Sequence, residues 1–142
     1  ESRFDAIVSA DGDSDRPLIS DEQGRWLRGD VAGILCAKFL KADAVCTPVS
    51  CNSAVEKCGW FRQVRRTRIG SPHVIAAMCE ATAAGAQRVI GYEANGGFLI
   101  NSDIDLDGNP DDVEALLAVI RRHRRSSRRC AACASCWRKT TP

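Results

Sequence analysis

Three aspartates stand at alternate positions near the start of the chain, in the stretch DGDSDRP at residues 11–17. They are Asp11, Asp13 and Asp15. One glycine and one serine separate them, and such small residues let a backbone curl so that the carboxylates converge on one cation. Carboxylate oxygens suit Mg²⁺, and Arg16 directly behind them carries a planar cation that suits a phosphorylated ligand. The pattern predicts a Mg²⁺ site beside an anion site, with a solvated acidic turn as the alternative.

A second loop with binding chemistry is GYEANGGF, residues 91–98. Its three glycines give the backbone freedom to wrap a ligand, and it lies between two short apolar runs. Glu93 offers acceptors and Asn95 both donors and acceptors, which are the groups that sugar hydroxyls require. A tight polar hairpin is the alternative interpretation.

The elements that must position these loops follow an alternating order. An apolar run at residues 6–8 predicts a strand that ends in the acidic loop, and a turn signal at residues 21–24 predicts a β-hairpin. Further strands are expected at 43–50, 62–70, 87–93 and 96–102, and helices at 29–42, 52–61, 71–86 and 111–123. Strands alternating with helices predict a three-layer α/β/α domain with a mostly parallel sheet, from about residue 29 to 120, preceded by a strand and hairpin from a neighbouring domain.

Helix boundaries are also predicted from single residues. Asp30 is a suitable N-cap for the first helix, and Asn52 or Ser53 for the second. For the third helix we expect Ser71 as N-cap, Pro72 at the first helical position, and Gly85 at the end.

Composition limits the class of protein. Hydrophobic residues make up 44% and charged residues 27% of the 142, which is typical of soluble globular chains. No apolar run reaches the roughly 20 residues that span a bilayer, so no membrane association is expected and the predicted location is the cytoplasm. Five cysteines lie scattered in apolar segments and are expected to be buried thiols in a reducing compartment. They are Cys36, Cys46, Cys51, Cys58 and Cys79.

The last 22 residues differ sharply from the rest. From Arg121 onward there are seven arginines, one lysine and no acidic residue. Since the whole chain carries +2 and this tail +8, the first 120 residues carry −6. Cys130, Cys133 and Cys136 offer three soft ligands where zinc or an iron-sulfur cluster needs four, and His123 is the candidate for the fourth. A disordered basic tail, a nucleic-acid contact involving Trp137, and the product of a reading-frame change are further interpretations.

Residues 103–114, DIDLDGNPDDVE, match the pattern of an EF-hand calcium loop. Asp103 and Glu114 occupy its first and last ligand positions. Against calcium binding, the preceding segment predicts a strand rather than a helix, and Pro110 lacks the N–H that pairs two such loops. An aspartate-rich turn that caps the next helix is the alternative.

The stretches DGDSDRP, TRIGSPHV (residues 67–74) and GYEANGGF, in this order, resemble the α-D-phosphohexomutase superfamily, specifically its phosphomannomutase and phosphoglucomutase branch. The resemblance implies a Mg²⁺-dependent isomerase of carbohydrate metabolism that moves a phosphoryl group between positions 1 and 6 of a hexose. It implies that Asp11, Asp13 and Asp15 hold Mg²⁺, that Arg16 is catalytic, and that Glu93 and Asn95 bind sugar hydroxyls. Arg68 and His73, with Thr67 beside them, are further substrate-binding candidates on the TRIGSPHV turn, although His73 also fits a surface histidine in a first helical turn.

The resemblance implies that residues 1–28 are the end of the family's second domain with the metal loop and that residues 29–120 are its third domain. The change in composition sets residues 121–142 apart as a basic tail that contains cysteines and is expected to be disordered. No stretch resembles the family's phosphoserine loop or its distal phosphate-binding domain. The chain alone is therefore expected to be inactive, with the missing domains and a mannose or glucose phosphate as partners. The alternative function is a non-catalytic calcium, zinc or nucleic-acid-binding module, although nucleic acid is not the expected partner.

Overall fold

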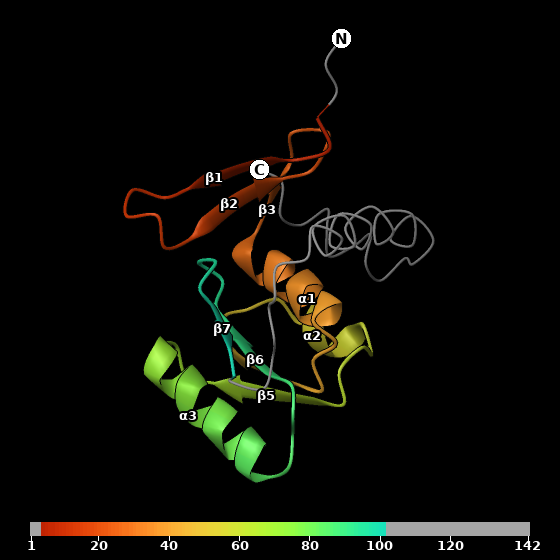
Figure 1. Cartoon of the computed structure of the whole chain (residues 1–142), viewed down its shortest axis with the longest axis vertical. Helices are drawn as coiled ribbons and strands as arrows, with labels where there is room; N and C mark the ends of the chain where they lie inside the picture. Colours follow the sequence, from red (N-terminus) through yellow and green to blue (C-terminus); the bar gives the residue numbers. More distant parts are fainter. Residues whose placement is uncertain (1–3, 102–142) are drawn as a thin grey trace. The chain divides into compact units, whose positions relative to one another are not determined.

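The computed structural model describes residues 4–101 of the chain (Figure 1). Three strands come first: β1 (Ile7–Ala10), β2 (Pro17–Ser20) and β3 (Trp26–Leu27). They are followed by α1 (Gly29–Phe39), β4 (Ala44–Pro48), α2 (Ala54–Lys57), β5 (Gln63–Thr67), α3 (Ser71–Ala83), β6 (Val89–Tyr92) and β7 (Phe98–Ile100).

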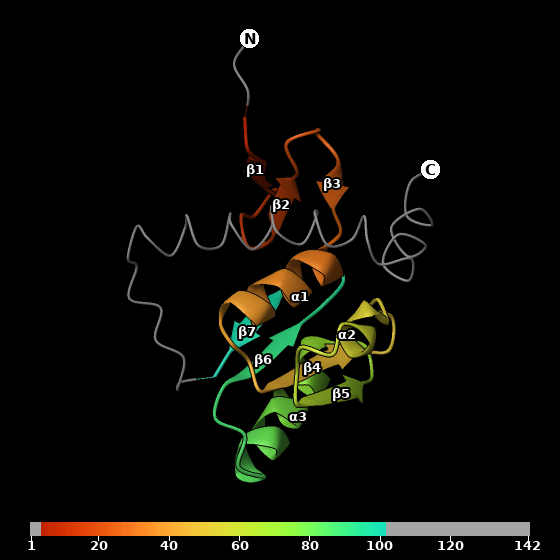
Figure 2. The same ribbon diagram turned by 90° about the vertical axis from the view of Figure 1, so that its right-hand side faces the viewer.

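The larger sheet has the strand order β5-β4-β6-β7. Strands β5 and β6 both pair in parallel with β4, and β7 pairs antiparallel with β6. Helix α1 covers one face of this sheet and α3 the other (Figures 1 and 2). The predicted three-layer α/β/α fold with a mostly parallel sheet is confirmed.

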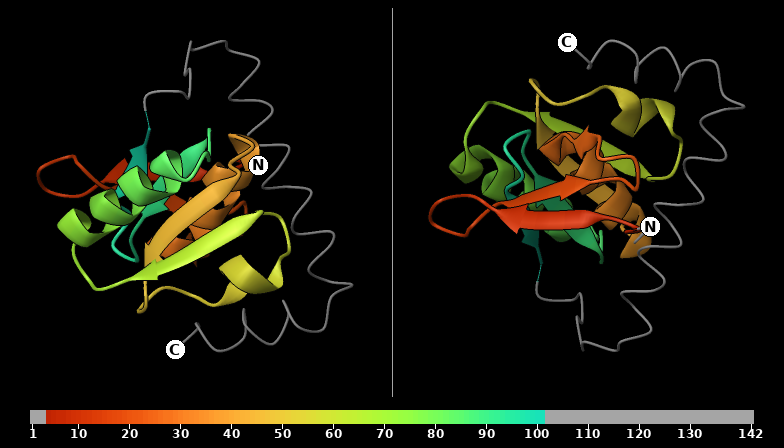
Figure 3. Two further views of the ribbon diagram at one scale, coloured as in Figure 1. Left: turned by 90° about the horizontal axis from the view of Figure 1, so that it is seen from below. Right: turned by 90° about the horizontal axis from the view of Figure 1, so that it is seen from above.

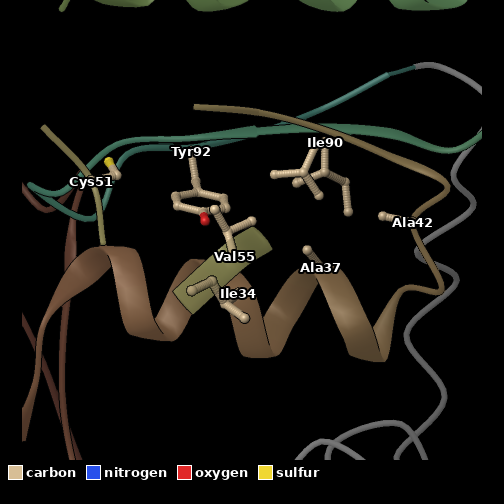
Figure 4. Close-up of a cluster of buried hydrophobic side chains, with 8 residues drawn as sticks. Ile34, Ala37, Ala42, Cys51, Val55, Ile90 and Tyr92 are labelled. Carbon is tan, nitrogen blue, oxygen red and sulfur yellow. The ribbon is translucent and has the colours of Figure 1, made fainter. Parts of the chain in front are cut away.

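Two apolar clusters fill the space between the layers. In the first, Ile90 and Tyr92 of β6 point toward α1, which presents Ile34 and Ala37 (Figure 4). The Tyr92 ring lies so close to the helix that a Cβ on Gly33 would come within 2.5 Å of its Cγ. The second cluster lies under α3 and consists of Ala44, Cys46, Val74, Met78, Ala81 and Val89.

Strands β1, β2 and β3 form a separate antiparallel sheet. Its pairing runs from Ile7 opposite Ser20 to Ala10 opposite Pro17, so the aspartate loop closes the hairpin between β1 and β2 (Figure 3). The predicted hairpin around residues 21–24 is also present, as the β2–β3 turn with Gly24 at φ 72°. Large apolar side chains of this sheet are exposed, including Val8 at 69% and Trp26 at 59%. A sheet exposed in this way is expected of part of a larger structure.

Several predicted helix boundaries were wrong. The first helix is capped by Arg28, and Asp30 lies inside its first turn. The third is capped by Gly70, whose φ of 117° suits glycine, so Ser71 is already helical. Pro72, expected at the first helical position, lies at the second, still within the first turn. Gly85 just after the end is confirmed, with φ 90°. The second helix, expected over residues 52–61, covers only Ala54–Lys57.

The prediction of five buried thiols holds for two cysteines only. Cys46 and Cys51 are buried, Cys36 and Cys58 are half-buried, and Cys79 is exposed on α3. All five are free. Cys79 was misassigned because the helix Ser71–Ala83 is rich in small apolar residues on its solvent side as well, which obscures its buried face.

Some predictions concern residues outside the described range of 4–101. They are the helix at 111–123, the calcium loop at 103–114, and the cysteine and arginine pattern of the tail. Within the described range, no helix is long and apolar enough to cross a bilayer.

Candidate active site

The aspartate loop is shaped by its own backbone. The Asp11 N–H donates to the Arg16 carbonyl at 3.1 Å, and the Ser14 N–H donates to the Asp11 carbonyl at the same distance. Ser14 has a φ of 62°, a left-handed conformation that tightens the turn. As a result, one carboxylate oxygen from each of the three aspartates lies within 4.8 Å of the other two.

Arg16 is tied to the same carboxylates. Its Nε donates to Asp15 Oδ1 at 2.9 Å and lies 3.3 Å from Asp11 Oδ2, and its backbone N–H donates to Asp11 Oδ1 at 3.2 Å. The hydrogen bond from Arg16 lowers the pKa of Asp15, and the same bond raises the pKa of Arg16. Asp15 is therefore ionised at neutral pH, the state that a cation ligand needs.

The second loop, residues 93–97, closes the hairpin between β6 and β7. The Glu93 N–H donates to the Gly97 carbonyl at 2.9 Å, and the Gly96 N–H donates to the Glu93 carbonyl at 3.2 Å. Asn95 Oδ1 accepts the Gly97 N–H at 2.9 Å, which holds the amide in the loop. A Cβ on Gly97 would lie 3.2 Å from Asn95 Oδ1 and 3.5 Å from Glu93 Oε2, so the two side chains predicted to bind sugar flank the same glycine.

These two loops meet. A Cβ on Gly96 would lie 3.4 Å from the Pro17 carbonyl oxygen and 3.7 Å from Arg16 Cβ. The tip of the 93–97 loop therefore rests against the end of the aspartate loop, although about 80 residues of sequence separate them. The structure gathers Asp11, Asp13, Asp15 and Arg16 on one loop and Glu93 and Asn95 on the other. The contact between the two loops is made by Gly96 with Arg16 and Pro17.

The third predicted segment, TRIGSPHV, lies at the carboxyl end of β5. Because β4, β5 and β6 are parallel, their carboxyl ends share one edge of the sheet, and the 93–97 loop follows β6 at that edge. Thr67 is buried, and its Oγ1 donates to the Arg68 carbonyl at 2.7 Å. Arg68 and His73 are exposed, and within residues 4–101 their side chains make no hydrogen bond with either loop. The TRIGSPHV turn thus shares the sheet edge without joining the two-loop cluster.

The sequence did not predict that Asp30 connects two segments of the chain by hydrogen bonds. Its side chain is completely buried, and it accepts hydrogen bonds from Arg28 Nε at 3.2 Å and Nη2 at 3.1 Å and from the Asn52 N–H at 2.9 Å. Asp30 therefore joins the residue that precedes α1 to the loop that follows β4. Only the position of this acid at a helix start was visible in the sequence, and it suggested a cap instead.

The aspartate loop fits a magnesium ion by the chemistry of its donors. Three carboxylates offer oxygen ligands, two of them from exposed side chains that a hydrated cation can reach. Asp11 and Asp15 are already aligned by Arg16, so their carboxylates are partly fixed before any ion binds.

Comparison with known proteins identifies the family of the chain. Residues 28–138 match the family described as phosphoglucomutase/phosphomannomutase, alpha/beta/alpha domain III. Over 102 residues the chain is 56% identical to a phosphomannomutase of Salmonella muenchen, covering 72% of this chain and 21% of the relative. Over 108 residues it is 53% identical to a phosphomannomutase of Sinorhizobium fredii, covering 76% and 23%.

Among solved structures, the apo form of an N-acetylglucosamine-phosphate mutase of the α-D-phosphohexomutase superfamily aligns with a TM-score of 0.54. Its identity is 20%, and the alignment covers 84% of this chain and 28% of the other, so this likeness concerns the fold. The fold is thus that of a sugar-phosphate mutase domain. The chain belongs to the phosphoglucomutase/phosphomannomutase family, and it spans little more than a fifth of the length of the two phosphomannomutases.

Proposed function

We propose that this chain supplies the metal-binding loop and the sugar-recognition loop of a phosphomannomutase-like phosphohexomutase, which transfers a phosphoryl group between positions 1 and 6 of a hexose phosphate. The observation that carries the proposal is the meeting of the two loops at Gly96 and Pro17. It joins the loop that carries the three aspartates to the loop that carries Glu93 and Asn95, and cation ligands together with groups suited to hydroxyls are the combination that a phosphorylated sugar requires. The two phosphomannomutases that are 56% and 53% identical support the substrate class.

In this proposal Asp11, Asp13 and Asp15 hold Mg²⁺. The bound ion would supply positive charge that offsets the charge on the transferring phosphoryl group. Arg16 contributes a second cation, and within residues 4–101 no hydrogen bond uses its Nη1 and Nη2 groups. These donors are free to bind a phosphate oxygen while Nε stays on Asp15.

Glu93 and Asn95 bind the sugar. Their loop is fixed by three hydrogen bonds, so the carboxylate and the amide are presented in a defined order. Arg68 and His73 are exposed further along the same sheet edge, and we place them as outer contacts of the ligand. Mannose and glucose phosphates are both candidate substrates.

The proposal includes the division at residues 28 and 120 and the need for further domains. By the family resemblance, phosphoryl transfer requires a phosphoserine loop and a distal phosphate-binding domain. No stretch of this sequence resembles either of them. We therefore expect no turnover of mannose 1-phosphate by the chain alone in a coupled assay with a bisphosphate activator. Turnover at the rate of a complete mutase would contradict that expectation. A cytoplasmic location stays a prediction of the sequence.

Binding tests the proposal more directly than turnover. Titrating the chain with mannose 1-phosphate in a calorimeter should give saturable binding with Mg²⁺ and at least about tenfold weaker binding with excess chelator. Asp13→Asn should reduce binding to the level seen with chelator, because it removes a metal ligand. Glu22→Gln removes the same charge from the β2–β3 turn of the same small sheet and should leave binding unchanged. Equal binding by the Asp13→Asn variant would refute the metal assignment.

A further inference from the structure

Three segments of the chain meet where the two loops touch. They are Gly29 at the start of α1, Gly96 at the tip of the 93–97 loop, and Arg16 and Pro17 at the end of the aspartate loop, which face Gly96 with the Pro17 carbonyl oxygen, Pro17 Cδ and Arg16 Cβ. We call this contact the glycine junction. Gly96 is the residue that contacts both of the other segments, Gly29 and Pro17.

The glycine junction leaves no room for a side chain at Gly29. A Cβ there would come within 2.6 Å of Gly96 Cα and 2.7 Å of the Ala94 carbonyl oxygen, and closer still to the Gly96 N. These are backbone atoms, which cannot rotate away as the end of a flexible side chain can. Gly96 has a φ of 96°, so an L-residue at this position is also strained. Glycine is therefore required at Gly29 by the close approach and at Gly96 by the backbone conformation.

The helix side of the junction is firmly anchored. Asp30, next to Gly29, is fully buried and holds the guanidinium of Arg28 and the Asn52 N–H. Taking these donors away from the buried Asp30 carboxylate is costly, so the first turn of α1 cannot easily shift to relieve a clash at Gly29. The cheaper response is movement of the 93–97 loop away from the helix, which changes its distance from Arg16.

We propose that the glycine junction is the positioning element that makes Mg²⁺ binding at the aspartate loop and hexose phosphate binding at the 93–97 loop depend on each other. This inference rests on the proposed function, since it requires both ligands. A phosphate close to Mg²⁺ strengthens its binding by charge attraction, and this attraction falls with distance. By linkage the ion strengthens hexose phosphate binding by the same factor. Gly29 and Gly96 act through the spacing that they set between the two loops and touch neither ligand.

The test compares Mg²⁺ affinity of the full chain with and without saturating mannose 1-phosphate, after correction for magnesium that the sugar phosphate itself complexes. In the unaltered chain we expect the sugar phosphate to tighten Mg²⁺ binding by about fivefold or more. In Gly29→Ala, Mg²⁺ affinity without sugar should stay within about twofold of the unaltered chain, whereas the effect of the sugar phosphate should fall below about twofold. Gly59→Ala is the matched control, because it strains a glycine at φ 64° that has no neighbour within 4 Å, and it should retain the full coupling.

Circular dichroism establishes that each variant is folded, and Gly96→Ala replaces Gly29→Ala if the latter is not. A Cβ at Gly96 would lie at an ordinary contact distance of 3.4 Å from the Pro17 carbonyl oxygen, so this variant strains the 93–97 loop through its φ of 96°. Gly96 is buried but belongs to neither apolar cluster. Full coupling in the folded junction variant, or independent binding of the two ligands in the unaltered chain, would overturn the inference while leaving the proposed function intact. Failure of the unaltered chain to bind either ligand would instead refute the proposed function, and the inference with it.

Discussion

At the scale of single residues, Arg66 on the edge strand β5 connects several segments of the chain by hydrogen bonds. Arg66 on β5 donates from Nε to Glu56 Oε1 at 2.6 Å and from Nη2 to Glu56 Oε2 at 2.8 Å, a two-point contact. The same guanidinium donates to the carbonyls of Pro48, Cys51 and Asn52. Arg66 therefore fixes the loop after β4, which in turn carries the Asn52 N–H bound by Asp30.

This contact predicts a pH dependence. The hydrogen bond from Arg66 lowers the pKa of Glu56 from 4.5, so ionised Glu56 stabilises the folded state above the unfolded pKa and loses that contribution as the pH falls through the folded value. Glu56→Gln should lower the free energy of unfolding by about 0.5–1 kcal/mol at pH 7, since the pair is partly exposed, and by progressively less below about pH 4.5.

Urea unfolding across this pH range, with the Glu56 carboxyl followed by NMR, measures both effects. Glu80→Gln is the control, because Glu80 is 72% exposed and meets Arg65 at a single 3.2 Å contact. Its effect should be smaller at pH 7. A Glu56 carboxyl that titrates at or above 4.5 would count against this account.

At the scale of elements, the close packing of α1 on β6 requires a glycine at position 33. Gly33 lies on α1 directly against the Tyr92 ring, and a Cβ there would be 2.5 Å from Cγ and 2.7 Å from Cδ2. Tyr92 is buried, so its ring has little space into which to retreat.

Gly33→Ala should therefore destabilise the chain by roughly 1–3 kcal/mol, even though alanine is the better helix former. Chemical denaturation measures the change. Gly12→Ala offers a contrast, since a Cβ at Gly12 meets nothing within 4 Å, and it should alter stability by less than about 0.5 kcal/mol. A neutral or stabilising Gly33→Ala would show that α1 can move away from the sheet.

Much of the element order could be predicted from the sequence because apolar runs alternate with glycine and polar turns. The buried run of β4 and the Pro72 and Gly85 signals around α3 gave the α/β/α fold correctly. Helix starts were less predictable, because Asp30 satisfies the usual requirement of a cap and yet is used to bind Arg28 and Asn52. No pattern in the sequence distinguishes an aspartate that caps its own helix from one that binds another loop.

The candidate site was only partly predictable. Residue types and their spacing suggested the candidate residues Asp11, Asp13, Asp15, Glu93 and Asn95. The contact between the two loops could not be predicted in this way, because it arises from tertiary packing at Gly29, Gly96 and Pro17. In the sequence, Gly29 and Gly96 look like ordinary turn glycines. Their role in the contact is not visible there, because the atoms next to them belong to distant segments of the chain.

At the scale of the whole molecule, two observations support the proposed need for further domains. The apolar sheet β1-β2-β3 is exposed, and the chain covers little more than a fifth of each phosphomannomutase. The described residues still contain two loops in contact, so ligand binding can be examined in this chain without the complete enzyme.

The central claim is that the aspartate loop and the 93–97 loop form one binding site. A heteronuclear NMR titration of the full chain with mannose 1-phosphate in the presence of Mg²⁺ tests it directly. We predict that amide signals of residues 11–17 and 93–97 shift together, with the same apparent affinity, and that chelation of Mg²⁺ abolishes both sets of shifts. Shifts confined to one loop, or to residues beyond 101, would contradict the claim.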